Sequence, residues 1–351
     1  MEAESDFLGA QLQGTYIQRQ LARTNRNFFL VGLGLIVAVT SYGVSASRYF
    51  YNFFKGPVEM SAEAIATVRS PETLERYFVS IKGDDSIDSG LQYVEKQVSQ
   101  SGVVESQTVK AGYSILVLGK RFLIVKRAPA DNSKQYEGAL MDLPADVHSQ
   151  IITPLLPDYP NAEAAFLPMM LDATGFRDEG YIAAAICIPV LLCALWIIWR
   201  VRTRIENPLR HPILNSLSRY GSLANSARQI DAESNGKRLG EVVLGQTWIL
   251  LPSLFFLRVY HIPNVIWAYK KVTKHSVNFI PTGKSYATVI VDRYGNPLEL
   301  SATEAKANEI LRVLCDKVPW AVFGFSEELS SAARADWAGF VAAVDERRLR
   351  S

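Results

Sequence analysis

Two uncharged apolar stretches decide the fold of this 351-residue chain: FFLVGLGLIVAVTSYGVSAS at residues 28–47 and YIAAAICIPVLLCALWIIW at residues 181–199. The hydrocarbon core of a bilayer is about 30 Å thick, and an α-helix crosses it with roughly 20 apolar residues. Both stretches meet this requirement. The sequence therefore predicts an integral membrane protein with two transmembrane helices.

The flanking charges predict the orientation of these helices, because cytoplasmic loops carry an excess of Lys and Arg. Arginines precede the first stretch and follow the second: Arg19, Arg23, Arg26, Arg200, Arg202, Arg204 and Arg210. The approach to the second stretch is instead acidic, with Arg177 as its lone basic residue after position 158. Arg48 and Lys55, after the first stretch, weaken this contrast without reversing it. The predicted topology is two-pass, with both termini in the cytoplasm.

A cleaved signal peptide is the competing interpretation of the first stretch, since Val44-Ser45-Ala46 resembles a small-residue cleavage site. An uncleaved anchor fits better, because 27 residues precede the stretch and aromatic residues typical of an interfacial belt follow it through Phe54. Ahead of the stretch, apolar residues recur at helical spacing and predict either an amphipathic helix on the inner membrane surface or a frayed polar helix. These residues are Phe7, Leu8, Leu12, Tyr16, Ile17 and Leu21.

The topology divides the chain into six segments. They are a cytoplasmic N-terminal segment (1–27), the first helix with its aromatic belt (28–54), an extracytoplasmic domain (55–180), the second helix (181–199), a basic linker with a membrane-proximal helix (200–239) and a cytoplasmic domain (240–351). A net charge of +2 argues against a nucleic-acid binder. The extracytoplasmic segment has no cysteine, and no Cys or His cluster has metal-ligand spacing, so neither disulfides nor a cofactor are predicted.

The extracytoplasmic segment is predicted to be β-rich, as a small barrel or half-open sheet. Its strongest signal is a hairpin in which strands at 114–118 and 122–125 flank Gly119-Lys120-Arg121. Further strands are expected at 77–81, 103–109 and 136–140, and residues 91–100 form a short helix or another strand. The stretch from Asp158 to Gly175 has no clean period and is expected to return the chain to the membrane.

One part of this segment has the spacing of a calcium site. Asp84, Ser86, Asp88 and Glu95 occupy the first, third, fifth and twelfth positions of an EF-hand-like loop. The sixth position, where the sharp turn requires Gly, is Ser89, and the preceding residues are typical of a strand. An acidic hairpin turn whose carboxylates face water is the favoured alternative.

After the second helix, a basic linker leads to one helix predicted over Pro212–Ala232. Short β-prone runs follow at 242–250, 255–260, 265–270, 276–280, 287–292 and 298–300. Tyr294-Gly295-Asn296 predicts a tight turn, and Ser301 is expected to cap a helix over 303–316. A further helix is predicted near 330–347. Strands followed by one covering helix indicate an α+β domain.

This order of elements resembles the pleckstrin-homology-like domains of bacterial membrane proteins, in which a bent sheet is closed at one end by a C-terminal helix. The resemblance is carried by Thr247-Trp248-Ile249-Leu250, by Asn264-Val265-Ile266-Trp267-Ala268-Tyr269, by the turn at 292–296 and by the helix that follows. The whole chain is similar to an uncharacterised family of two-helix integral membrane proteins with such a domain. Phosphoinositide binding by this fold implies a basic first hairpin, and the chain has no clear one.

A basic patch in the cytoplasmic domain comprises Lys270, Lys271, Lys274 and Lys284, with His275 beside them. It predicts either docking on anionic lipids of the inner leaflet, at about 1 kcal/mol per charge, or an edge strand that lysines protect from aggregation. Thr282-Gly283-Lys284-Ser285 matches the end of a P-loop, but a β-prone run follows it where a P-loop needs a helix. Residues 278–284 are therefore expected to form a loop between strands.

Two classes of function follow from these features. The first, which we prefer, is a non-enzymatic scaffold, sensor or regulator that links the external domain to a cytoplasmic binding module, with the lipid bilayer and another protein as partners. The second is a membrane-bound hydrolase or transferase, which needs a convergent nucleophile, base and orienting group that the sequence does not show. A transport path is disfavoured because neither apolar stretch carries an ionisable residue.

Overall fold

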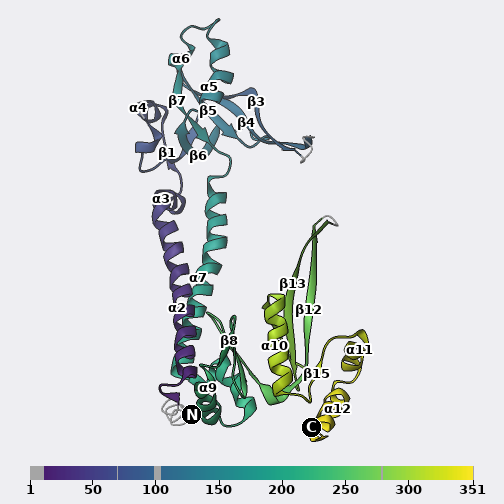
Figure 1. Cartoon of the computed structure of the whole chain (residues 1–351). Helices are drawn as coiled ribbons and strands as arrows, with labels where there is room; N and C mark the ends of the chain where they lie inside the picture. Colours follow the sequence, from purple (N-terminus) through teal and green to yellow (C-terminus); the bar gives the residue numbers. More distant parts are fainter. Residues whose placement is uncertain (1–11, 69, 99–103, 278–279, 351) are drawn as a thin grey trace. The chain divides into compact units, whose positions relative to one another are not determined.

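The computed structural model describes residues 12–68, 70–98, 104–277 and 280–350 (Figure 1). Tertiary contacts divide the chain into two units. Met1–Leu33 and Ala194–Ser351 form the first, here called the terminal unit, and Gly34–Cys193 form the second, here called the central unit. Each long apolar helix contributes one end to each unit.

The two expected apolar helices are present, and both are longer than the apolar stretches that predicted them. Helix α2 spans Tyr16–Ser45 and helix α7 spans Phe176–Glu206. Only 6% and 11% of their most apolar windows are buried, whereas a core helix of a globular domain is largely covered. At Gly32 the helices approach closely, since a Cβ there would lie 2.9 Å from Ile198 and 3.2 Å from the Ala194 carbonyl oxygen.

The central unit contains one open seven-stranded sheet with the order β1-β2-β6-β7-β5-β4-β3. Its strands are β1 Val58–Glu59, β2 Phe78–Lys82, β3 Asp85–Val98, β4 Val104–Leu118, β5 Arg121–Arg127, β6 Gln135–Asp142 and β7 Phe166–Asp172. The hairpin predicted at Gly119 is confirmed as β4–β5, with Gly119 at φ +63°. The segment 91–100, left open between helix and strand, lies in β3 as far as residue 98.

One prediction for the central unit is wrong: residues 158–175 do more than return the chain to the membrane. They contain β7, which pairs antiparallel with β6 and parallel with β5 inside the sheet. Strand β7 is buried at five of its seven positions, so its sequence lacks the alternation of a half-exposed strand.

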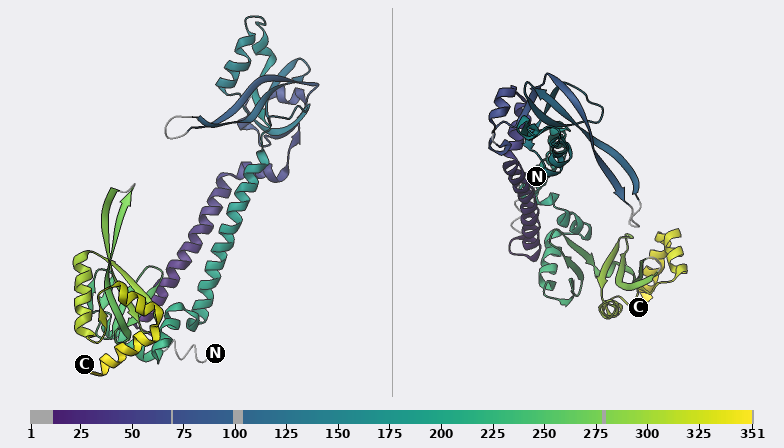
Figure 2. Two further views of the ribbon diagram at one scale, coloured as in Figure 1. Left: turned by 90° about the vertical axis from the view of Figure 1, so that its right-hand side faces the viewer. Right: turned by 90° about the horizontal axis from the view of Figure 1, so that it is seen from above.

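Helices cover both faces of this sheet. One face forms a core that includes Val79, Ile81 and Met169, packed against Ile65 of helix α4 (Ala62–Thr67). The other face packs against Val147 of helix α5 (Ala145–Ile151). The short helix α6 (Ala162–Ala165) precedes β7. Beyond these cores, β3 and β4 continue as a two-stranded ribbon that projects from the sheet (Figure 2).

A buried asparagine ties helix α3 (Ser47–Lys55), which follows α2, to this sheet. The Asn52 side chain is fully buried. Its Nδ2 donates to the carbonyl oxygens of Arg48 and Glu75 at 2.9 Å, and its Oδ1 accepts from the amides of Tyr77 and Phe78 at 3.1 and 3.3 Å. Helix α3 is thereby bonded to the beginning of β2 and to the residues that lead into it.

The terminal unit contains two four-stranded sheets, with the orders β11-β10-β9-β8 and β14-β13-β12-β15. The strands are β8 Lys237–Leu239, β9 Val242–Leu244, β10 Trp248–Pro252, β11 Leu257–His261, β12 Val265–Val277, β13 Ile280–Asp292, β14 Pro297–Ala302 and β15 Val322–Phe323. The predicted turn is confirmed between β13 and β14, where Gly295 has φ +77°. Strands β12 and β13 extend past β14 as a long ribbon (Figure 2).

Several predicted helix boundaries in this unit are wrong. The single helix expected over 212–232 is two helices, α8 (Pro212–Leu217) and α9 (Leu223–Glu233), because Gly221 at φ +106° breaks the chain direction. Helix α10 (Glu304–Lys317) is capped by Thr303, whose hydroxyl accepts from the Lys306 amide, rather than by Ser301. The last predicted helix is also two, α11 (Glu327–Ala335) and α12 (Trp337–Arg350).

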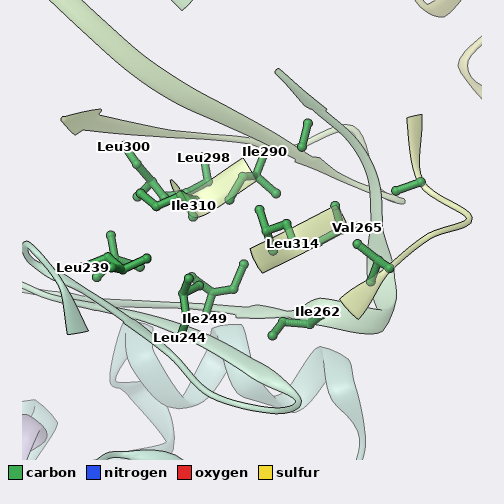
Figure 3. Close-up of a cluster of buried hydrophobic side chains, with 14 residues drawn as sticks. Leu239, Leu244, Ile249, Ile262, Val265, Ile290, Leu298, Leu300, Ile310 and Leu314 are labelled. Atoms are coloured by element: carbon green, nitrogen blue, oxygen red, sulfur yellow. The ribbon is translucent and has the colours of Figure 1, made fainter. Parts of the chain in front are cut away.

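Helix α10 and the two sheets share one hydrophobic core (Figure 3). Ile310 and Leu314 of α10 lie between side chains of the first sheet, such as Leu244 and Ile249, and side chains of the second, such as Ile290. On the outer face of the second sheet, Trp267 packs with residues of α11 and α12. The mixed helix and sheet class predicted for the chain is thus confirmed.

A second core lies on the other face of the first sheet and includes the beginning of α2. Ile17 is fully buried and Leu21 nearly so, packed with α8, α9 and Trp248. The amphipathic N-terminal stretch therefore packs on protein instead of lying on a membrane surface; its first members, Phe7 and Leu8, lie outside the described residues. Helical periodicity reports one apolar face but does not identify what covers it.

Candidate functional site

The structure separates the four residues with calcium-site spacing. Asp88 and Glu95 both lie on β3, where seven residues of extended chain span roughly 20 Å, too far for one ion. The Asp88 carboxylate is 2.9 Å from the buried Arg127 guanidinium, and Glu95 is 3.2 Å from Lys110. Asp84 accepts from the Gly119 amide, and Ser86 lies 3.4 Å from the Tyr136 hydroxyl. Within the described residues, no group of three or more His, Cys, Asp or Glu could hold a metal ion.

The predicted lysine patch is placed on the β12–β13 ribbon, where its charges are divided. Lys270 pairs with Glu304 at 3.0 Å, and Lys271 pairs with Glu299 at 2.9 Å. Lys274 faces Lys284 across the two strands. Alternation along β12 puts Lys271 on the opposite face from Lys270 and Lys274. The four lysines do not converge on one point, and two of them are neutralised by carboxylates of the same unit.

The P-loop-like residues also lie on this ribbon. Residues 280–284, expected to be a loop, belong to β13, while Asn278 and Phe279 lie outside the described residues. No helix N-terminus follows Ser285, whose hydroxyl lies 2.9 Å from the His275 imidazole. The expected loop is therefore wrong for residues 280–284, which continue the strand, and a phosphate-binding loop with a following helix is not formed there.

A cavity of about 670 Å³ in the terminal unit brings together residues that the sequence gave no reason to group. Its walls come from α2, the end of α7, helix α8, strand β11 and the β13–β14 turn. Side chains that matter for its chemistry are Phe28, Arg204, His211, Arg219, Tyr220, Phe256, Arg258 and Asp292. Ligand sites of proteins commonly have about 300–1,000 Å³.

His211 presents a buried, unpaired hydrogen-bond donor at this cavity. The residue is 2% exposed, and its Nδ1 accepts from the Ile213 amide at 3.2 Å, which caps helix α8. Burial, and secondarily Arg204, lowers the pKa of His211 from 6.5 to about 4, so the ring is neutral near pH 7. Because Nδ1 is the acceptor, the proton resides on Nε2, which has no partner.

Three arginines supply positive charge around this donor. Arg204 Nε is buried without a hydrogen-bond partner, and its guanidinium lies 5.4 Å from the Phe28 ring centre. Arg219 and Arg258 are exposed at the rim. Across the part of the chain that the structure describes, no carboxylate forms a salt bridge with any of the three.

The acidic and phenolic groups in the wall leave this positive character intact. Asp292 is 4% exposed, and its carboxylate accepts from the amides of Tyr294 and Asn296 at 2.9 Å and from the Asn296 side chain. Burial, and then Asp292, raises the pKa of Tyr220 to about 12, so this phenol stays neutral. Counted together, the cavity residues carry more positive than negative charge and offer unpaired N–H donors.

The β10–β11 loop forms an apolar tip beside the cavity. Leu254, Phe255 and Phe256 are 56%, 37% and 43% exposed. The tip is fixed against α2, since the Asn27 side chain donates to the Leu254 carbonyl oxygen at 2.6 Å and the Phe28 and Phe255 rings lie 5.1 Å apart. Phe28 is the first residue of the first apolar stretch, so this exposed tip lies level with the point where that stretch begins.

Comparison with family models, with curated proteins and with solved structures found no match for the chain. The geometry of the cavity therefore carries the functional argument. His211 belongs to no sequence motif, and its role as a helix cap and its unpaired Nε2 emerge only from the structure. The sequence marks Arg204 only as a charge that flanks the second apolar stretch.

Proposed function

We propose that the chain is a two-pass integral membrane protein with both termini in the cytoplasm, and that it acts without catalysis as a scaffold, sensor or regulator. The terminal unit would be its cytoplasmic binding module and the central unit its external domain. Two uncovered apolar helices and the arginines at one end of them support this placement. A pleckstrin-homology-like assignment of the module is supported by two sheets and α10 around one core.

The observation that carries the proposal is the shared core of α2 and the module. Ile17 and Leu21 pack in the same cluster as Ile230 and Trp248. A module tethered by a flexible linker would leave these side chains exposed. Here the first helix enters the module as a structural element, so the module is held at the end of the apolar stretch. Such a fixed position suits a protein that presents a binding surface to the membrane or to a partner.

The catalytic alternative finds less support in the cavity. With a pKa of about 4, His211 is a weak base near neutral pH. Tyr220, whose pKa is about 12, is a correspondingly poor nucleophile. A hydrolase or transferase would need an activated nucleophile beside a base, and this cavity instead offers unpaired donors and fixed positive charge.

Cysteine accessibility tests the proposal. Single cysteines replace Ser133 in the central unit and Ser331 on α11, both exposed, in a chain whose three native cysteines are Ala. A membrane-impermeant maleimide is then added to sealed vesicles with the external face outward. We expect Ser133→Cys to label and Ser331→Cys to label only after permeabilisation. Labelling of Ser331→Cys alone would reverse the topology, and full labelling of both variants without permeabilisation would contradict a two-pass arrangement.

A further inference from the structure

We propose that the cavity beside His211 binds the headgroup phosphate of an anionic phospholipid from the cytoplasmic leaflet. The inference rests on the proposed function, which puts the beginning of the first apolar stretch and the end of the second at the cytoplasmic membrane surface. It goes further by assigning a ligand class to a site outside the lysine patch. Four residues carry it: Arg204 and His211 as donors, and Phe28 and Phe256 as the apolar wall.

The depth of Arg204 matches the phosphate layer. Trp199 ends the second apolar stretch, and Arg204 follows five residues later on the same continuous helix. At 1.5 Å per residue this is about 8 Å beyond the hydrocarbon core. The headgroup region adds roughly 5–8 Å on each side of that core. A lipid lying along the exposed apolar surface of α7 would therefore bring its phosphate to the level of Arg204.

The donors at this level lack acceptors within the described protein. His211 Nε2 and Arg204 Nε are both unpaired and have less than 1 Å² of exposed surface, so a ligand reaches them when a side chain of the wall turns aside. A buried donor without an acceptor destabilises the protein, and a charged donor does so more strongly. A phosphate oxygen accepts from both kinds of donor, and bonds from a guanidinium to an anion are the stronger ones. Arg219 and Arg258 at the rim add long-range attraction for the same charge.

The apolar tip favours a lipid over a soluble anion. A free phosphate has no apolar part that could pack against the exposed side chains of Leu254, Phe255 and Phe256. Aromatic rings are favoured at the boundary between headgroups and hydrocarbon, and Phe28 and Phe255 contact each other where the first apolar stretch begins. The site thus pairs an anion pocket with an interfacial apolar wall, as a phospholipid pairs its phosphate with its acyl chains.

Native mass spectrometry of the full chain in neutral detergent tests the site. Phosphatidylglycerol and phosphatidylcholine are added separately, and bound lipids are counted for the unchanged chain and for three variants. Arg204→Gln removes one donor. His211→Asn keeps an acceptor for the Ile213 amide, and hence the helix cap, but loses the Nε2 donor. Arg202→Gln is the matched control, since Arg202 lies on the same helix, is 77% exposed and pairs with Glu206 outside the cavity.

We expect phosphatidylglycerol to bind the unchanged chain at least about tenfold more tightly than phosphatidylcholine, and each cavity variant to lose about tenfold in affinity for it. The control variant should change less than about twofold. Equal losses in Arg204→Gln and Arg202→Gln, with no loss in the uncharged exchange His211→Asn, would reduce the effect to net charge and overturn the proposal. Retention of binding in the Arg204→Gln/His211→Asn double variant would overturn it as well.

Inorganic phosphate separates the two sources of the ligand. If millimolar phosphate displaces phosphatidylglycerol and binds alone as tightly, the site recognises a soluble anion and the lipid assignment is wrong. Lipid counting in detergent does not depend on topology, so it can succeed even if cysteine labelling reverses the orientation. If cysteine labelling follows the expected pattern but the unchanged chain does not prefer phosphatidylglycerol, the lipid site is refuted and the proposed function stands. Circular dichroism of each variant checks that it is folded.

Discussion

Replacing Ile17 with Ala tests whether the first apolar helix is part of the module's core. Ile17 is fully buried in a cluster that contains Trp248 and Leu250 of β10. Truncation of a buried Ile to Ala costs about 2–5 kcal/mol, from lost burial and the cavity left behind. If Ile17 belongs to this core, that cost is subtracted from the stability of the first sheet, although the residue precedes it by more than 200 positions.

Hydrogen exchange measures this effect in the intact protein, because it reports the free energy of opening segment by segment. In nanodiscs, the β9 and β10 amides of Ile17→Ala should exchange roughly 30-fold to several thousandfold faster than in the unchanged chain. Ile205→Ala is the matched control, since Ile205 is 63% exposed and should leave these amides within about threefold. Equal exchange in the two variants would show that Ile17 lies outside the core and remove the main support for a fixed module.

Substitutions at His211, Gly138 and Asn52 test three further details of the structure. Folding lowers the pKa of His211 from 6.5 to about 4, so the unfolded chain binds a proton at a higher pH than the folded protein. The free energy of unfolding should therefore fall by roughly 3 kcal/mol as the pH drops from 6.5 to 4. His211→Asn should flatten this part of a plot of unfolding free energy against pH. A Cβ on Gly138 would collide with the Asp172 carbonyl oxygen, so Gly138→Ala should destabilise the central unit by about 3 kcal/mol or more in thermal melts, whereas Gly283→Ala, with open space around it, should not. Asn52→Ala removes the acceptor of the Tyr77 and Phe78 amides and should cost about 2–4 kcal/mol; unchanged exchange of those amides would contradict the bonding described for Asn52.

The elements that the sequence predicted well are those with local signals. Two long uncharged stretches predict helices without reference to any partner, and Gly119 and Gly295 adopt positive φ in the turns expected of them. Strand β7 was missed because burial on both faces removes the alternation that identifies a strand. The break between α8 and α9 was missed because apolar residues keep helical spacing on both sides of Gly221.

The candidate site was less predictable, because its residues come from distant parts of the chain. Phe28, Arg204 and Arg258 are separated by 54 residues or more, and no spacing rule connects them. The lysine patch shows the opposite error. Lysines near one another in the sequence suggested one charged surface, but Glu299 and Glu304 pair with two of them from later elements. Charge counted along a chain omits the partners that folding supplies.

The two ends of α2 and its continuation are held in different ways, and this bears on how such a protein would sense a change. At one end, Ile17 and Leu21 are packed in an apolar core, which tolerates small shifts of a helix. At the other, Asn52 holds the chain by three hydrogen bonds of defined direction, to Glu75, Tyr77 and Phe78. If the protein transmits movement along α2, the end beside the proposed lipid site is the one that can shift more easily.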